Sequence, residues 1–95
     1  MISVQVLVIE GLITGCRSLK EKRIVLNSLK DKIRSKYNVS VSELDFNDKW
    51  QKTLLGVACV SNNGKLNRKT LEKIADLIYE DGRIEIINRS IEELA

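Results

Sequence analysis

The chain contains no histidine and only two cysteines among its 95 residues. Cys16 and Cys59 form no C-x-x-C pair, so the spacing typical of a zinc site does not occur. Without histidine, neither thiol has the base that nucleophilic chemistry normally requires, and no acid, base and nucleophile set converges in the sequence. We therefore predict a protein that is not an enzyme, that binds neither metal nor cofactor, and whose thiols stay reduced.

Long apolar runs and phosphate-binding glycine loops are also missing. No stretch approaches the roughly 18 apolar residues that a membrane span needs. The first six residues include alternating polar positions and lack the basic region of a signal peptide. Neither G-x-x-x-x-G-K-[ST] nor G-x-G-x-x-G occurs. These absences predict a cytoplasmic protein without membrane association or a dedicated nucleotide loop.

What the chain does contain is an ordinary globular composition, with 43% hydrophobic and 31% charged residues. We predict a single domain over residues 1–95. A domain of this size buries only part of its surface, so association with further copies would add stability.

Charge is distributed unevenly along the chain, although the formal net charge is only +3. Residues 17–36 hold eight of the sixteen Lys and Arg but only two acids, whereas residues 76–95 hold six acids and two Arg. Such polarisation attracts an acidic partner to one region of the molecule.

The hydrophobic pattern predicts six elements. Alternation predicts strands at 2–9, 39–44, 53–60 and from 84 to about 91. Ser18 and Glu21 fit a capping box that opens a helix reaching about Tyr37. A second helix is expected over 65–80, with Gly82 supplying the left-handed position that ends it.

This order, β-α-β-β-α-β, predicts a ferredoxin-like α+β fold, in which a four-stranded antiparallel sheet carries both helices on one face. We expect the face of the first strand formed by Val4, Val6 and Val8 to meet the helices, leaving Leu7 and Ile9 on the opposite face. The third strand is expected to be covered on both sides. The large apolar area then left open predicts a homo-oligomer formed through the sheet face or the edge strands.

Several motifs resemble those of the YlxP-like family of small bacterial proteins of unknown function (DUF503). The matching stretches are residues 17–23 (RSLKEKR), 38–41 (NVSV), 50–51 (WQ), 55–58 (LGVA) and 60–62 (VSN). The resemblance implies a ferredoxin-like fold and no established activity. Because genes of the family often lie beside genes for translation initiation and ribosome-binding factors, it also implies an association with ribosomes.

Two basic segments are the candidate contact surface for RNA or another anion. Their residues are Arg17, Lys20, Lys22, Arg23, Lys30 and Arg34 on the first helix, and Lys49, Trp50 and Lys52 in the loop before the third strand. Lys and Arg would contact phosphates, and Trp50 would stack on a base. The alternatives are a solvated helix whose long side chains cover apolar edges, and a Trp that packs on the sheet edge or in a subunit interface.

These features favour a binding module that contacts ribosomal RNA or a ribosome-associated protein. Two other functions fit the same sequence: an oligomeric module for a small molecule or for regulation, and a purely structural oligomerisation protein. RNA-recognition motifs stack bases on aromatic residues of the central strands. The first and third strands carry no aromatic residue here, so that mode of binding is not expected.

Overall fold

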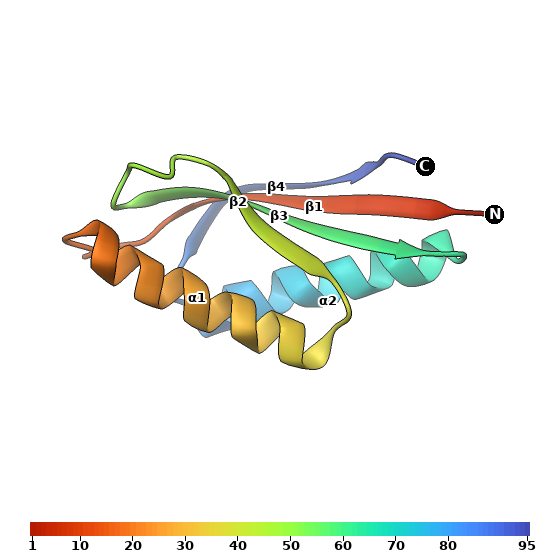
Figure 1. Cartoon of the computed structure of the whole chain (residues 1–95), viewed down its shortest axis with the longest axis horizontal. Helices are drawn as coiled ribbons and strands as arrows, with labels where there is room; N and C mark the ends of the chain where they lie inside the picture. Colours follow the sequence, from red (N-terminus) through yellow and green to blue (C-terminus); the bar gives the residue numbers. More distant parts are fainter.

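A computed structural model describes all residues 1–95. Its elements are β1 (Ser3–Leu12), α1 (Leu19–Lys36), β2 (Ser40–Asp45), β3 (Lys52–Ser61), α2 (Gly64–Asp81) and β4 (Glu85–Glu93). The strands form one antiparallel sheet in the order β2-β3-β1-β4, and both helices cover the same face (Figure 1). The predicted ferredoxin-like α+β fold is therefore confirmed. Neither helix combines the length and the apolar character that crossing a membrane requires.

The start of α1 and the end of α2 have the caps that the sequence predicts. The Ser18 hydroxyl accepts a hydrogen bond of 3.1 Å from the backbone N–H of Glu21. The Glu21 carboxylate accepts a hydrogen bond of 2.6 Å from the backbone N–H of Arg17. In a standard capping box the donor would be the N–H of the cap residue itself, which is Ser18 here. At the end of α2, Gly82 adopts a left-handed φ of 78°, a conformation that glycine reaches without steric cost.

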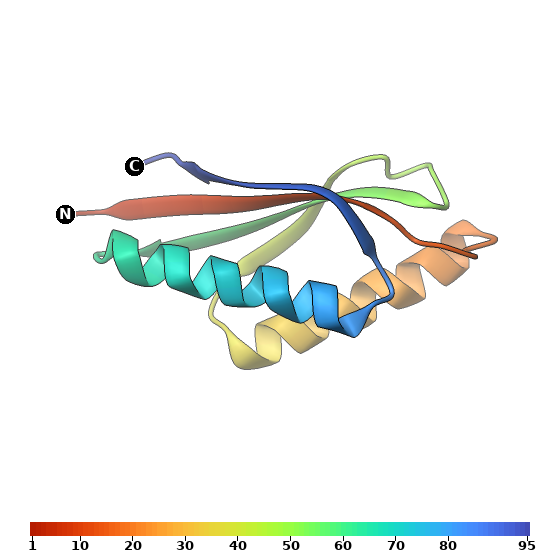
Figure 2. The ribbon, with the colours of Figure 1, turned by 180° about the vertical axis from the view of Figure 1, so that it is seen from behind.

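The core lies between the sheet and the two helices, which cross beneath it (Figure 2). It contains 16 buried apolar residues. The helices contribute Leu26, Leu29, Ile33, Leu71, Ile74, Ala75 and Ile78, and the two central strands contribute Leu7, Ile9, Leu55, Val57 and Cys59. On each helix these residues recur every three or four positions, so each helix buries one apolar side.

The prediction for the two faces of β1 is wrong. Leu7 and Ile9 face the helices, and each is 1% exposed, whereas Val4, Val6 and Val8 lie half-buried on the open face. The third-strand prediction also fails, because β3 is covered on its helix face only and Val60 is 68% exposed.

The helix-facing side of β1 carries polar residues, so its sequence pattern resembles that of an exposed side. Ser3 and Gln5 share the buried face with Leu7 and Ile9, and they meet the first turn of α2. The Gln5 amide donates to the carbonyl of Gly64 at 2.8 Å, and the Asn67 amide donates to the carbonyl of Ser3 at 3.1 Å. Buried polar groups need hydrogen-bond partners, and this half of the strand and the first turn of α2 supply them to each other.

Both edge strands are irregular. The β1–β4 register shifts so that Ile87 has no partner, and the β2–β3 register shifts at Leu44. Leu44 lies over Gly56, where an added Cβ would come within 2.7 Å of the Leu44 Cδ1 atom. Bulges of this kind twist an edge strand and discourage it from pairing with another chain.

Candidate nucleic-acid interface

Two loops far apart in the sequence lie side by side at one end of the molecule (Figure 1). One joins β1 to α1, and the other joins β2 to β3. The backbone N–H of Ile13 donates to the carbonyl of Gln51 at 2.9 Å, and the Gln51 side-chain amide donates to the carbonyl of Cys16 at 3.0 Å. The basic helix start and the Trp50 loop therefore form one continuous surface.

Lys22 is the buried link between these segments. Its ammonium donates to the carbonyls of Phe46 and Lys49, both at 2.6 Å, and lies 2.8 Å from a carboxylate oxygen of Glu43. That carboxylate also accepts a hydrogen bond of 2.6 Å from the Thr53 hydroxyl. A charge can remain buried only when it is paired and hydrogen-bonded, and this set of partners meets that requirement.

The expectation that Lys22 contributes to a contact surface is therefore corrected. Its side chain is 1% exposed, and all three ammonium protons are directed at groups of the same chain. The residue belongs to the basic motif in sequence but supports the loop in space. Residues 17–23 and the pair Trp50–Gln51 both occur among the motifs, which is the one signal in the sequence that these two segments belong together. Nothing in the motifs indicates that Glu43 is the counter-ion of Lys22.

The loop that Lys22 holds has an unusual backbone at Phe46, whose φ is 63°. The N–H of Phe46 donates to the side chain of Asp45 at 2.7 Å. Lys52 lies over the Phe46 ring, with its ammonium 4.4 Å from the ring centre and 3.2 Å from a carboxylate oxygen of Glu10. The charge of Lys52 is thus already partnered, which makes it a weaker candidate for contact with phosphate.

Trp50 is 52% exposed and does not belong to the core. Beside it lies an open hollow of about 520 Å³. The hollow is lined by Leu12, Phe46, Asp48, Lys49, Trp50, Gln51 and Lys52. An exposed indole with apolar neighbours can accept a flat aromatic ring, and it can equally pack against another protein.

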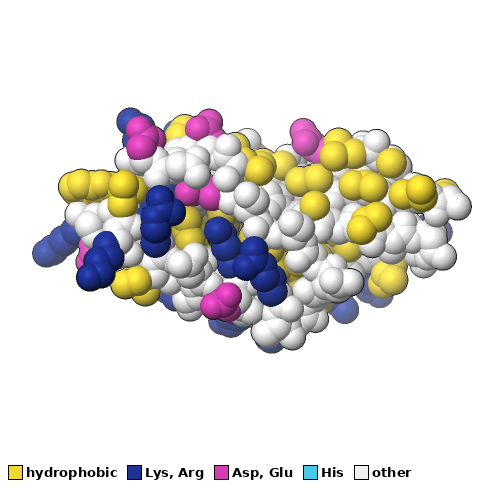
Figure 3. All heavy atoms as spheres, in the orientation of Figure 1, with side chains coloured by type: hydrophobic (Ala, Val, Ile, Leu, Met, Phe, Trp, Pro, Cys, Tyr) yellow, Lys and Arg dark blue, Asp and Glu magenta, His cyan; other side chains and the backbone are white.

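The other candidate cations remain on the surface. Arg17, Lys20, Arg23 and Lys49 are exposed and form no ion pair; we call these four residues the basic end. Lys and Arg side chains gather over the α1 half of the face seen in Figure 3, while apolar side chains gather over the sheet toward the chain termini.

Lys30 and Arg34 continue the basic side of α1 toward β2. Lys30 is half-buried and lines, with Arg23, a small hollow of about 170 Å³. The guanidinium of Arg34 donates to the carbonyl of Val41 at 3.1 Å, so this side chain also ties α1 to β2. Both residues lie farther from Trp50 along the helix than the basic end does.

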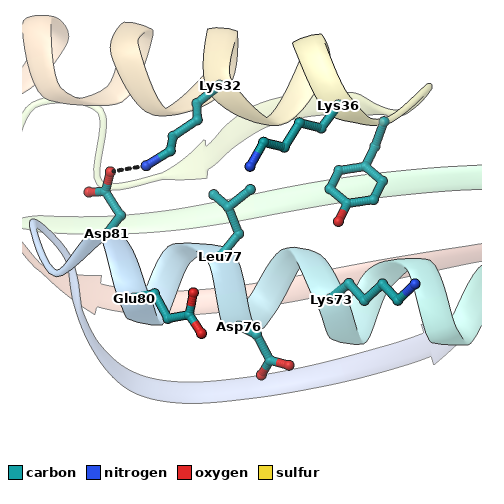
Figure 4. Close-up of a pocket in the computed structure, with 8 residues that line it drawn as sticks. Lys32, Lys36, Lys73, Asp76, Leu77, Glu80 and Asp81 are labelled. Atoms are coloured by element: carbon teal, nitrogen blue, oxygen red, sulfur yellow. Dashed lines mark hydrogen bonds and ion pairs between the residues drawn. The ribbon is translucent and has the colours of Figure 1, made fainter.

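A second groove, of about 470 Å³, runs between the two helices (Figure 4). Lys32 and Lys36 face it from α1, and Lys73, Asp76, Glu80 and Asp81 face it from α2. Hydrogen bonds from Arg83 at 2.8 Å and Lys32 at 3.3 Å lower the pKa of Asp81 to about 2, although burial opposes this shift. The groove therefore has mixed charge and does not select for an anion.

The two thiols have structural partners. Cys16 and Cys59 are buried and donate to the Ser18 carbonyl and to the Asn67 amide oxygen, at 3.3 and 3.2 Å. Burial raises the pKa of the Cys59 thiol, which favours its neutral form. No group of three or more His, Cys, Asp or Glu side chains is placed to hold a metal ion.

Fold and surface together define a small ferredoxin-like α+β domain with an exposed tryptophan and unpaired cations at one end. The family described as "Protein of unknown function (DUF503)" matches residues 4–91, and the chain belongs to this family. A relative is the uncharacterised protein YlxP of Bacillus subtilis (strain 168), which is 38% identical over 76 residues, covering 80% of this chain and 83% of the relative.

Proposed function

We propose that this protein is a cytoplasmic, non-enzymatic binding module that contacts RNA through the basic end and Trp50. The observation that carries the proposal is the buried Lys22. By holding the carbonyls of Phe46 and Lys49, it fixes an exposed Trp beside cations that have no partner in the chain.

Charge and stacking would act together at this surface. Exposed, unpaired Arg and Lys side chains are available to replace the counterions around phosphates, which is the main source of affinity in nucleic-acid binding. An exposed indole adds stacking on an unpaired base, worth about 1–3 kcal/mol. Single-stranded loops, where bases are unstacked, present both groups at once. The expected target is therefore an unpaired loop, such as those of ribosomal RNA.

Fluorescence anisotropy with a labelled RNA hairpin tests the proposal. The hairpin should carry an unpaired loop of about ten nucleotides, the site-size range of single-strand binders. The full chain is titrated at several salt concentrations, and four phosphate contacts predict a slope of log K against log salt of about −3. Replacing Arg17, Lys20, Arg23 and Lys49 with Ala should abolish most of this slope.

A matched control removes the same charge elsewhere. Lys65, Arg68, Lys69 and Lys73 are exposed on α2, and their replacement with Ala should leave affinity and slope close to those of the natural chain. Trp50→Ala should weaken binding about 5- to 150-fold, the equivalent of about 1–3 kcal/mol, without changing the slope, because stacking releases no counterions. Equal losses in both four-residue variants, or no binding at about 50 mM salt, would contradict the proposal.

The hollow beside Trp50 supports a second candidate, a small planar molecule. Its volume of about 520 Å³ lies within the range of small-molecule pockets, and Leu12, Phe46 and Trp50 supply apolar contacts. Titration of Trp50 fluorescence with free nucleosides separates the two candidates. Saturable quenching by a nucleoside, with no binding of the RNA hairpin, would favour the small molecule.

A further inference from the structure

We propose that the open face of the sheet is a dimer interface, and that a second copy of this chain covers it. The open face consists of Val4, Val6 and Val8 of β1, Leu54, Ala58 and Val60 of β3, and Leu44 of β2. None of these residues belongs to the core or packs against it from the helix side.

The open face is apolar at its centre, and the charged residues of the two middle strands, Glu10 and Lys52, lie at the end of these strands nearest the Trp50 loop, where they pair with each other. Val60 is 68% exposed and Leu44 is 51% exposed, while the valines of β1 are half-buried by their neighbours alone. The small residues Gly56 and Ala58 leave the middle of the face shallow, and Leu44 lies across Gly56. A contiguous apolar patch of this kind marks an interaction surface.

The size of the face suits a second copy. The two central strands have ten residues each, and the sheet has four strands. With a rise of about 3.3 Å per residue and a strand spacing of about 4.8 Å, the face measures about 33 by 19 Å, or about 600 Å². Two such faces bury about 1,200 Å² together, which is the lower end of the range for stable interfaces. The result is a helix-sheet-sheet-helix stack, in which both sheets are covered on both faces.

Other occupants fit the face less well. Nucleic acid would need free cations or aromatic rings on these strands, but Lys52, the one cation of the two middle strands, is paired with Glu10, and no strand carries an aromatic residue. An anionic membrane would need basic residues around the rim, but the nearest charges include Glu92 and the Lys52–Glu10 pair. Edge-to-edge pairing is hindered by the bulges at Ile87 and Leu44. Homodimer interfaces, by contrast, are the more apolar class, and twofold symmetry is the commonest arrangement.

Sedimentation velocity of the full chain, measured from about 1 to about 200 µM, tests the proposal over the range of affinity expected for a small interface. We expect a monomer–dimer equilibrium with its midpoint in this range. Val60→Glu should raise the dissociation constant at least about a hundredfold, because the twofold axis brings two new carboxylates into one apolar interface. Since Val60 is largely exposed in one copy, the variant should keep its fold, which circular dichroism verifies.

Leu66→Glu and Ile24→Glu are the matched controls. Each introduces the same charge at an exposed apolar position, on α2 and on α1, at 55% and 61% exposure. Both should dimerise like the natural chain. A dimer that survives Val60→Glu, or that is weakened equally in the controls, would overturn the proposal. A chain that remains monomeric at about 200 µM would overturn it as well and would leave the face to a different protein.

Discussion

Lys22 shows how one residue can belong to a basic motif and yet serve the fold. Its neighbours Lys20 and Arg23 are exposed. Lys22 lies on a different side of the same helical turn, and its side chain reaches the carbonyls of the β2–β3 loop. The ammonium replaces its lost hydration with two carbonyls and the Glu43 carboxylate. The shape of the Trp50 loop therefore depends on a buried charge, which is costly to leave without its partner.

Lys22→Met should destabilise the protein by about 3 kcal/mol, because Glu43 is left buried and unpaired. Urea unfolding measures the loss, and the emission of Trp50 reports whether the loop has moved. Lys20→Met, which changes an exposed residue of the same turn, should alter stability by less than about 0.5 kcal/mol. Adding Glu43→Gln to Lys22→Met should recover part of the loss. If the two Met variants behave alike, Lys22 is not the support described here.

Asp81 is the second residue whose charge has a clear structural role. It ends α2, where a carboxylate is disfavoured by the helix dipole and where no basic residue occupies the last turn. Arg83 and Lys32 supply the missing positive charge at 2.8 and 3.3 Å. Their hydrogen bonds hold the pKa of Asp81 at about 2, against an ordinary value of 3.8.

Asp81→Asn should therefore lower stability at neutral pH by up to about 2 kcal/mol. Because the pKa is lower in the folded state, the carboxylate stabilises the protein above about pH 4, and this contribution is lost as the pH falls toward about 2. Urea unfolding at a series of pH values should show the natural chain and the variant converging in acid. Asp76→Asn, at a carboxylate that is 70% exposed, is the control and should have a small effect at every pH. A difference that stays constant down to about pH 2 would contradict this account.

At the scale of elements, the junction of β1 with β4 depends on a glycine. Gly11 follows the shift in register at Glu10, and an added Cβ would collide with the Ile84 side chain and lie 3.2 Å from the carbonyl of Glu85. Ile84 is buried and anchors the segment between α2 and β4. A side chain at Gly11 would thus force the two strands apart where the last strand begins.

Gly11→Ala should cost about 1–3 kcal/mol through overpacking. A double-mutant cycle with Ile84→Ala, measured by urea unfolding, isolates the contact. The alanine at position 11 should be tolerated better once the Ile84 side chain is shortened, so the two changes should be less than additive. Strict additivity would show that Gly11 is required for some reason other than this close approach.

At the scale of the whole molecule, charge and apolar surface are separated. The basic end and Trp50 occupy the start of α1 and the loops beside it at one end, whereas the open face, apolar at its centre, lies on the side of the sheet opposite the helices (Figure 1). The two proposed contacts therefore use different surfaces, and either could be lost without the other. The layer structure explains the apolar face, because a two-layer domain covers only one side of its sheet.

Dimerisation through the open face should also make thermal stability depend on concentration. Raising the protein concentration about a hundredfold should raise the unfolding midpoint by about 5 °C, because the dimer is favoured by mass action. The midpoint of Val60→Glu should not change with concentration. Differential scanning calorimetry measures both, and a midpoint that rises equally in the two proteins would contradict the role given to this face.

The sequence by itself determined the elements and their order. Ser18 and Gly82 lie at helix ends because a side chain or a backbone conformation there satisfies terminal backbone groups, and these are local properties that a sequence displays. The spacing of the buried apolar residues on both helices is a local property of the same kind. Together with the motifs, these local signals were sufficient to predict the ferredoxin-like fold and the family.

Only the tertiary structure decided which face of β1 is buried and what Lys22 does. Both faces of β1 carry aliphatic residues, so the alternation identified a strand without saying which side meets the helices. That choice depended on Ser3 and Gln5 meeting the start of α2, about 60 residues away in the chain. Lys22 likewise takes its partners from a loop beyond the next strand. Long-range contacts of this kind leave no periodic trace in a sequence, because they depend on where whole elements come to lie.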